Sequence, residues 1–563
     1  MLAGLLHACA AVAPRASSEQ QASAPTQKEA LPAVALSSQL LYDLLLGEIA
    51  GQRGRLEVAV ESLKRAALTS RDPRLAQRAT QVALYAKRPD EAIDSARLWV
   101  ELQPDNLEAR EALSVALLEQ GQLAEAQAQM EKILALIGEG GNLGQAYLRL
   151  AALLGKQTLR VAALDVMRAL VAKHPKLPEA QFALAHMAVR ANDLDTAAAS
   201  IDAALRLSPG WEEVALFKAR ILTSQKDTGR IEAFYEEFLA DHPQAKTFRM
   251  NYARYLVDSK QWERARAQFK QVVDDSPKDG DAAYAVGLLA LQSEAYDEAE
   301  KYLTRNLELQ PENDQARLYL GHIAERRKQY EEAARWYQKI EGGGFFFEAQ
   351  LRIGMLMAKQ GELAAGRAHY AALDTETESQ EIQLIVAEDQ MLRDARQYDE
   401  AFKVLTKGLG KFPDNSDLLY ARALTAERLD KIDVHETDLR KSIKADPKNA
   451  NALNALGYTL ADRTTRYQEA FGLIEQALAL KPDDPYIMDS MGWVQYRLGN
   501  LAEAKKYLKA ALDKRNDAEI SAHLGEVLWM MGDTAGAESV WKRALQDTPD
   551  NELLLGVIKK FKP

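Results

Sequence analysis

Histidine is the side chain of this sequence best suited to acid–base or metal chemistry, and eight are present. His435 precedes Glu436, but no second histidine stands four residues later, so the helix of zinc proteases is absent. His369 and His523 have no clustered partner in the sequence. The histidines therefore predict no catalytic or metal centre, and we expect a protein that is not an enzyme and needs no cofactor.

One glycine-rich stretch could suggest a loop that cradles phosphate. The segment Gly138–Gly144 contains four glycines, but it follows a predicted helix instead of a strand and lacks a Gly-Lys-Ser/Thr sequence. A phosphate-binding loop needs that lysine and the strand-to-helix turn. We therefore interpret this stretch as an extended loop between helices.

A second glycine run precedes three aromatic residues. Gly342–Gly344 are followed by Phe345, Phe346 and Phe347. Three adjacent side chains cannot all lie on one face of a helix. Either two of them pack in the core at a loosened junction, or the run is an exposed aromatic anchor for a partner. All three are candidate partner-binding residues.

Composition and net charge argue against several classes of protein. The formal net charge is −11, and an acidic surface repels phosphate backbones, which disfavours nucleic-acid binding. Hydrophobic residues make up 47% of the chain and aromatic residues 7%, as expected for helices packed through small side chains. Cys9 is the only cysteine, so an internal disulfide is excluded. No apolar run reaches 18 residues, so no transmembrane helix is predicted.

Proline and alanine reveal an internal repeat. Prolines recur every 34 residues, with one gap of three periods after Pro311 and a last step of 35: Pro175, Pro209, Pro243, Pro277, Pro311, Pro413, Pro447 and Pro482. Alanine stands twelve residues before most of these prolines, and the same alanine spacing continues into repeats that lack the proline. The series is Ala59, Ala92, Ala126, Ala163, Ala197, Ala265, Ala299, Ala333, Ala401, Ala470, Ala504 and Ala537. A second small residue precedes the alanine by twelve positions, as at Gly321 and Gly525. The register shifts at Gly138–Gly144, Gly342–Phe347 and Asp462–Tyr467.

This phasing predicts a helix–turn–helix unit. The small residues let helices A and B approach closely, and the proline ends helix B. The 34-residue period resembles the tetratricopeptide repeat (TPR) family. We therefore expect an all-α fold, a TPR superhelix (α-solenoid) of about fifteen repeats over residues 36–550, with a capping helix in 551–563. The resemblance implies an extended concave groove that binds other polypeptides.

Four further residues are candidates for that groove. His186 and His322 share one position of the repeat, directly after the small residue of helix A. Either they contact a ligand in the groove, or they form a solvated part of its wall. Arg254 and Tyr284 stand where some TPR proteins carry the lysine and asparagine of a clamp for chaperone tails. Because the clamp residues are missing, we exclude chaperone-tail binding and keep Arg254 and Tyr284 as candidate partner-binding residues.

The N-terminus differs in composition from the repeats. Residues 10–35 are rich in Ala, Ser, Gln and Pro and predict a flexible tether. Residues 1–9 end in Leu6-His7-Ala8-Cys9, which resembles a bacterial lipobox whose cysteine is lipidated. The apolar run is short and has no preceding Lys or Arg. Either the natural start lies further upstream or Cys9 is incidental. Ala10 after the cysteine implies sorting to the outer membrane.

A repeat array behind a lipidated cysteine resembles the bacterial TPR lipoproteins that serve carboxyl-terminal processing proteases. The resemblance implies a periplasmic adaptor that recruits and activates such a serine protease and presents peptidoglycan hydrolases to it. We expect contact with the membrane through the lipid only, and no nucleic acid as partner. The alternative is a TPR scaffold lipoprotein for exopolysaccharide export or outer-membrane assembly.

Overall fold

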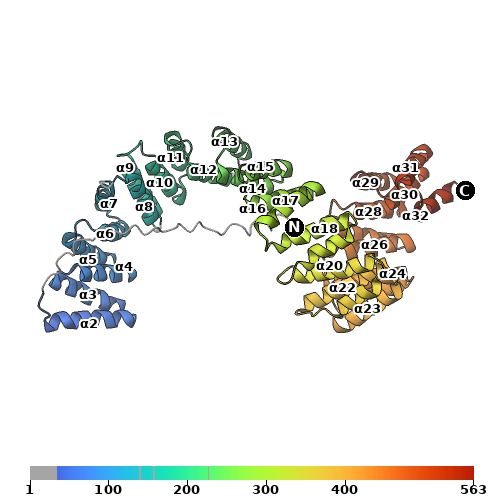
Figure 1. Ribbon diagram of the computed structural model, residues 1–563, viewed down its shortest axis with the longest axis horizontal. Coiled ribbons are helices and arrows are strands. Elements are labelled where there is room, and N and C mark those ends of the chain that lie inside the picture. The colour runs from blue at the N-terminus through green and yellow to red at the C-terminus, as the bar shows by residue number, and fades with distance from the viewer. Residues whose placement is uncertain (1–33, 139–140, 156–158, 226, 563) are drawn as a thin grey trace. The chain divides into compact units, whose positions relative to one another are not determined.

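The computed structural model describes residues 34–138, 141–155, 159–225 and 227–562. These residues form thirty-one helices and no strand, arranged as fifteen consecutive pairs and a single last helix. In Figure 1 consecutive helices lie side by side in chain order. The expected all-α TPR solenoid of about fifteen helix–turn–helix repeats is thus confirmed. Cys9 and the tether up to residue 33 lie outside the described residues.

The contacts divide the chain into two units, Met1–Tyr302 and Leu303–Pro563. The helices of the first unit are α2 (Ser38–Gln52), α3 (Leu56–Ser70), α4 (Pro73–Tyr85), α5 (Pro89–Leu102), α6 (Leu107–Glu119), α7 (Leu123–Gly138), α8 (Leu143–Leu154), α9 (Arg160–Val171), α10 (Pro178–Arg190), α11 (Leu194–Leu207), α12 (Glu212–Gln225), α13 (Thr228–Asp241), α14 (Lys246–Asp258), α15 (Trp262–Asp275) and α16 (Gly280–Gln292). Helix α17 (Tyr296–Leu309) spans the division.

The second unit continues the same alternation of helices A and B. Its helices are α18 (Asp314–Arg326), α19 (Tyr330–Gln338), α20 (Phe346–Lys359), α21 (Leu363–Ala371), α22 (Glu378–Asp394), α23 (Tyr398–Lys411), α24 (Ser416–Arg428), α25 (Ile432–Ala445), α26 (Ala450–Arg463), α27 (Tyr467–Leu480), α28 (Pro485–Arg497), α29 (Leu501–Lys514), α30 (Ala518–Met530), α31 (Thr534–Asp547) and α32 (Glu552–Phe561). The even-numbered helices up to α30 are the A helices, and their odd-numbered successors are the B helices.

The phased small residues are the contact points within each pair. Every alanine of the helix B series is buried; Ala333, for example, is fully inaccessible. On helix A, a Cβ added to Gly47 would lie 2.7 Å from Leu63 Cγ, and one added to Gly321 would overlap the ring of Tyr337. The small residue of helix A therefore makes room for a large residue sixteen positions later on helix B.

The prolines lie just beyond the ends of the B helices. Helix α15 ends at Asp275, two residues before Pro277, because proline has no N–H to continue the helix. The next A helix then starts from a polar cap, since the Asp279 carboxylate accepts a hydrogen bond from the Ala282 N–H at 2.8 Å. Asn313 caps α18 in the same way. Proline and cap together set the turn between repeats.

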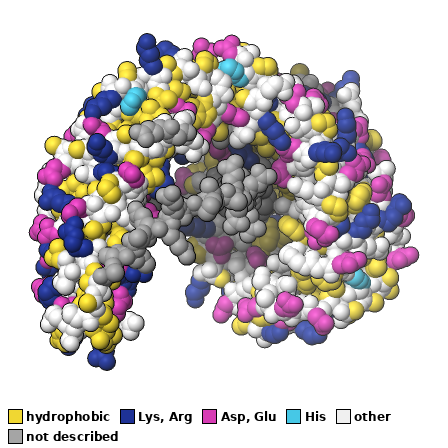
Figure 2. Space-filling model, turned by 60° about the vertical axis from the view of Figure 1, so that its left-hand side comes forward, with side chains coloured by type: hydrophobic (Ala, Val, Ile, Leu, Met, Phe, Trp, Pro, Cys, Tyr) yellow, Lys and Arg dark blue, Asp and Glu magenta, His cyan; other side chains and the backbone are white. Residues whose placement is uncertain are grey.

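The three register shifts all fall at junctions between helices, and each overlaps a helix end. Helix α7 ends at Gly138, and the next helix starts at Leu143. Helix α20 starts inside the phenylalanine run, at Phe346, and α26 ends at Arg463, before α27. Among the described residues no helix is both long and apolar enough to cross a bilayer. Figure 2 shows Lys and Arg side chains interspersed with Asp and Glu over the visible face.

Candidate functional site

His186, on α10 of the first unit, is half-buried and packs against two buried phenylalanines. Its ring centroid lies 4.1 Å from that of Phe217 and 4.6 Å from that of Phe182. Burial lowers the pKa of His186, and the nearby Arg220 cation lowers it further. The ring is therefore neutral at pH 7 and packs as an aromatic side chain. Whether it contacts a partner stays a prediction.

His322, in the same repeat slot on α18, has a similar environment in the second unit. Its ring lies 6.0 Å from Tyr337, and its Nε2 lies 3.9 Å from a carboxylate oxygen of Glu348. Burial lowers its pKa to about 4, with a further contribution from the Arg352 cation. This histidine is neutral as well. The two slot-mates lie in different units, His186 in the first and His322 in the second.

The other candidates of the first unit lie on neighbouring A helices. Arg254 is exposed on α14, and Tyr284 is half-buried on α16. Asn251, one turn before Arg254, accepts a hydrogen bond from the Tyr235 hydroxyl at 2.8 Å, which ties it to helix α13. Arg254 is thus available to a partner, and its role, like that of Tyr284, stays a prediction.

The phenylalanine run is split between core and surface. Phe345 caps α20 and packs, half-buried, against the cluster that contains Tyr337 and Ile353. Phe346 is 37% exposed, and Phe347 is half-buried. Phe345 thus packs against the core, as the first reading expects, whereas the reading of the run as an anchor for a partner stays a prediction. Phe346 is the member that is most accessible to a partner.

The second unit has a hollow surface that the sequence analysis did not find. Two adjoining hollows share Tyr458, Asp462 and Leu553. The residues that line them come from the A helices α24, α26, α28 and α30 and from α32, with His435 of α25 as the one exception: Glu427, Arg428, His435, Asn454, Ala455, Tyr458, Thr459, Asp462, Arg463, Tyr486, Asp489, Ser490, Trp493, Tyr496, Arg497, Glu519, His523, Glu526, Glu552, Leu553, Gly556, Val557 and Lys560. We call this surface the C-terminal groove.

A buried ion pair lies at the base of the C-terminal groove. His523 Nδ1 lies 3.0 Å from both carboxylate oxygens of Asp489, on the preceding A helix. Burial alone would lower the pKa of His523, but the Asp489 carboxylate outweighs it and the pKa is raised. The expectation that His523 has no partner was therefore wrong. The missed signal is their separation of 34 residues, close to one period, which places them on successive A helices.

His435 also proves to be structural. It takes the slot that holds alanine in other repeats and is fully buried. Its Nδ1 lies 2.9 Å from the Ala423 carbonyl oxygen, and its Nε2 lies 2.9 Å from the Thr459 hydroxyl. Both ring nitrogens are thus paired. No group of three or more metal-ligand side chains is assembled anywhere in the described ranges.

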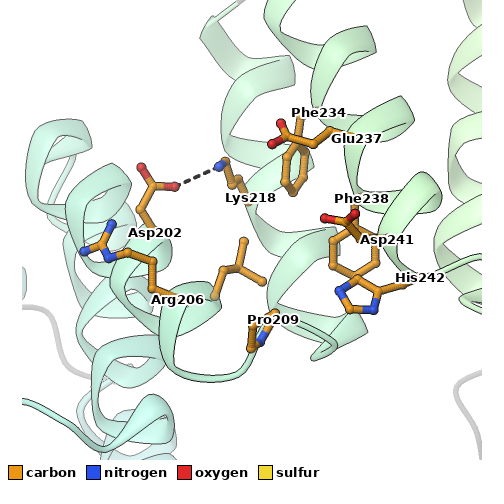
Figure 3. A pocket seen from close by; sticks show the side chains of 10 residues that line it. Asp202, Arg206, Pro209, Lys218, Phe234, Glu237, Phe238, Asp241 and His242 are labelled. Carbon is orange, nitrogen blue, oxygen red and sulfur yellow. Dashed lines mark ion pairs between the residues drawn. The ribbon is translucent and has the colours of Figure 1, made fainter.

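The first unit has a smaller hollow between α11, α12 and α13 (Figure 3). Lys218 reaches across it to Asp202 at 2.8 Å and lies 4.4 Å from the centre of the Phe234 ring. His242 lines the opposite side and packs on Phe238, with ring centroids 4.7 Å apart. The cation at the centre of this hollow is already engaged by its own neighbours.

Comparison with known proteins agrees with this repeat geometry. One tetratricopeptide repeat model matches residues 143–210, 231–279, 253–305, 284–344 and 436–485, and a second matches 464–527. The TPR repeat-containing protein PA4667 of Pseudomonas aeruginosa is 42% identical over 492 residues, which span 87% of this chain and 82% of that protein. The chain belongs to the tetratricopeptide repeat family.

Other TPR relatives are similar over shorter stretches. The type IV pilus assembly protein PilF of Pseudomonas aeruginosa is 25% identical over 164 residues, or 28% of this chain and 65% of PilF. The solved structure of TTC0263, a thermophilic TPR protein of Thermus thermophilus, has a TM-score of 0.30 and 20% identity, covering 32% of this chain and 99% of that one. TPR arrays are generally protein-interaction scaffolds without catalysis of their own.

Proposed function

We propose that this TPR protein is a periplasmic lipoprotein that works as an adaptor for a carboxyl-terminal processing protease. In this proposal the array recruits and activates the serine protease and presents clients such as peptidoglycan hydrolases to it. Cys9 carries the lipid and holds the protein at the outer membrane. Holding client and protease together raises their effective concentration, which accelerates cleavage without any chemistry by the adaptor.

The observation that supports the proposal is the C-terminal groove. Its walls are the A helices of four successive pairs and α32, so it is long enough to receive an extended or helical segment of another chain. Tyr458, Tyr486 and Trp493 supply aromatic surface, and Glu427 and Asp462 supply charge. Aromatic side chains rimmed by charges are the composition of protein-binding hot spots.

Affinity capture tests the proposal. The full-length chain, immobilised through its C-terminus, is exposed to periplasmic extract and the captured proteins are identified by mass spectrometry. We expect a serine protease with a peptide-binding domain, together with peptidoglycan hydrolases. The purified protease should then cleave those hydrolases faster when the chain is added. Capture without any such acceleration would contradict the adaptor role.

A second candidate is a scaffold for assembly of an envelope machine, including exopolysaccharide export or outer-membrane assembly. The similarity to PilF, whose name assigns it to type IV pilus assembly, favours this alternative. The same capture experiment separates the two. Export porins, barrel-assembly components or pilus subunits among the captured proteins would support the scaffold and oppose the protease adaptor.

A further inference from the structure

The part of the C-terminal groove next to α32 has an excess of available negative charge. Its two outer carboxylates, Asp462 and Glu552, are exposed, and within residues 227–562 neither makes an ion pair. The third, Glu526, is buried and already accepts hydrogen bonds from Lys560 Nζ at 2.8 Å and from the Tyr496 hydroxyl at 3.0 Å. Two carboxylates are therefore free to receive a cation from outside.

The other cation on this wall is engaged elsewhere. Arg497 donates one hydrogen bond to the main-chain oxygen of Asp462 at 3.1 Å and another to the Tyr467 hydroxyl at 2.8 Å. Its guanidinium also lies 5.0 Å from the centre of the Tyr467 ring. These bonds occupy the guanidinium, and within residues 227–562 it makes no ion pair with the Asp462 carboxylate.

A second, independent observation comes from Trp493. This side chain lines the same hollow and is 7% exposed, and its indole Nε1–H is buried without an acceptor among the described residues. A buried donor without an acceptor is unfavourable, because it has lost its hydrogen bond to water. A carbonyl oxygen brought in by a bound peptide would remove that cost. Trp493 thus brings a donor without an acceptor to the wall of a hollow that also carries two exposed carboxylates.

Aromatic rings complete the arrangement. Tyr458, Trp493 and Tyr496 line the hollow beside the two carboxylates. Faces of aromatic rings attract ammonium and guanidinium groups. An anionic ligand would meet unpaired carboxylates, and an apolar one would leave them desolvated. The ligand that fits the carboxylates, the aromatic rings and the Trp493 donor is a positively charged side chain carried on a peptide.

We propose that this hollow is a subsite for a lysine or arginine side chain of a bound polypeptide. The cation lies between Asp462 and Glu552, and a neighbouring carbonyl oxygen of the peptide accepts the hydrogen bond of Trp493. The inference rests on the proposed protein-binding function and adds the class of segment that the C-terminal groove selects. It gives the last repeats a preference for basic segments.

Selection from a randomised displayed peptide library on the immobilised full-length chain tests the subsite. We expect enriched peptides to share Lys or Arg at one position. The double variant Asp462→Asn/Glu552→Gln should lose that preference and bind the selected peptides roughly tenfold more weakly. Asp483→Asn is the matched control, because this carboxylate is 85% exposed, pairs with Lys514 and lies outside the groove.

A double-mutant cycle locates the contact. The basic residue of a selected peptide is replaced by norleucine, and its affinity is measured for the wild-type chain and the double variant. We expect the two losses to be strongly non-additive, because both remove the same ion pair. Additive losses, enrichment without basic residues, or no enrichment at all would overturn the subsite. If partner capture from extract nonetheless persists, the proposed adaptor function stands without it.

Discussion

At the scale of single residues, the side chains capable of chemistry serve packing and pairing. His174 Nδ1 lies 2.8 Å from the Tyr147 hydroxyl, which ties a helix C-terminus to its partner helix. His435 fills an alanine slot, and His523 pairs with Asp489 of the preceding repeat. Side-chain size is most strictly limited at the small residues of helix A, because a large side chain of helix B occupies the space beside them.

Gly321→Ala should be strongly destabilising. The new Cβ would overlap the fully buried ring of Tyr337, and a close-packed pair can relieve that overlap only by moving apart. We expect a loss of about 1–3 kcal/mol, seen as faster hydrogen exchange in α18 and α19. Gly342→Ala is the control, since a Cβ there meets nothing within 4 Å. Equal exchange in both variants would contradict the packing argument.

The neutral ring of His322 predicts a loss of stability in acid. Its pKa is about 4 in the folded protein, against roughly 6.5 in an unfolded chain. The unfolded state therefore binds the proton first, and the stability present above pH 6.5 is lost as the pH falls toward 4. Urea midpoints at about pH 7 and about pH 4.5 should differ less in His322→Gln than in the wild type. An unchanged difference would show that this ring does not titrate as described.

At the scale of elements, the regular repeat sets the contacts within each helix pair. Where the repeat is irregular, different side chains are exposed at the helix end. The loop before α20 replaces the usual proline turn, so α20 begins with aromatic residues instead of a polar cap. Phe345 is then held against the core of the pair, while Phe346 faces outward. At this irregular junction Phe345 therefore has a packing role, while Phe346 is free for a role in partner binding.

Phe345→Ala and Phe346→Ala should separate those roles. We expect Phe345→Ala to lower stability by roughly 1–3 kcal/mol, because it removes half-buried apolar surface. Phe346→Ala should change stability by less than about 0.5 kcal/mol and weaken partner capture. Thermal melting and the capture experiment supply the two measurements. Full capture by Phe346→Ala would remove this run from the list of partner contacts.

At the scale of the whole molecule, the two units carry different surfaces. The hollow of the first unit, between α11 and α13, has its central cation, Lys218, paired to Asp202. The C-terminal groove of the second unit keeps the carboxylates of Asp462 and Glu552 available. We therefore expect the second unit to contribute charge selectivity for basic segments.

Membrane attachment belongs to the same scale. With a complete signal sequence in front of it, Cys9→Ala should move the protein from the membrane fraction to the soluble periplasm, because lipid chains are the proposed anchor. Fractionation followed by immunoblotting measures the change. Cys9→Ser should behave identically, since serine takes no lipid. Persistence of either variant in the membrane fraction would refute lipidation at this position.

The amino-acid sequence by itself determined the helical class, the number of repeats and the places where helices end. These follow from local rules that recur every period: proline stops a helix, Asp or Asn caps the next, and a small residue marks each crossing. The pairing of Asp489 with His523 was decided only by tertiary structure, because that contact crosses from one repeat to the next. Asp462 and Glu552 likewise indicate a binding site only because the stacking of repeats places them in one hollow with aromatic residues.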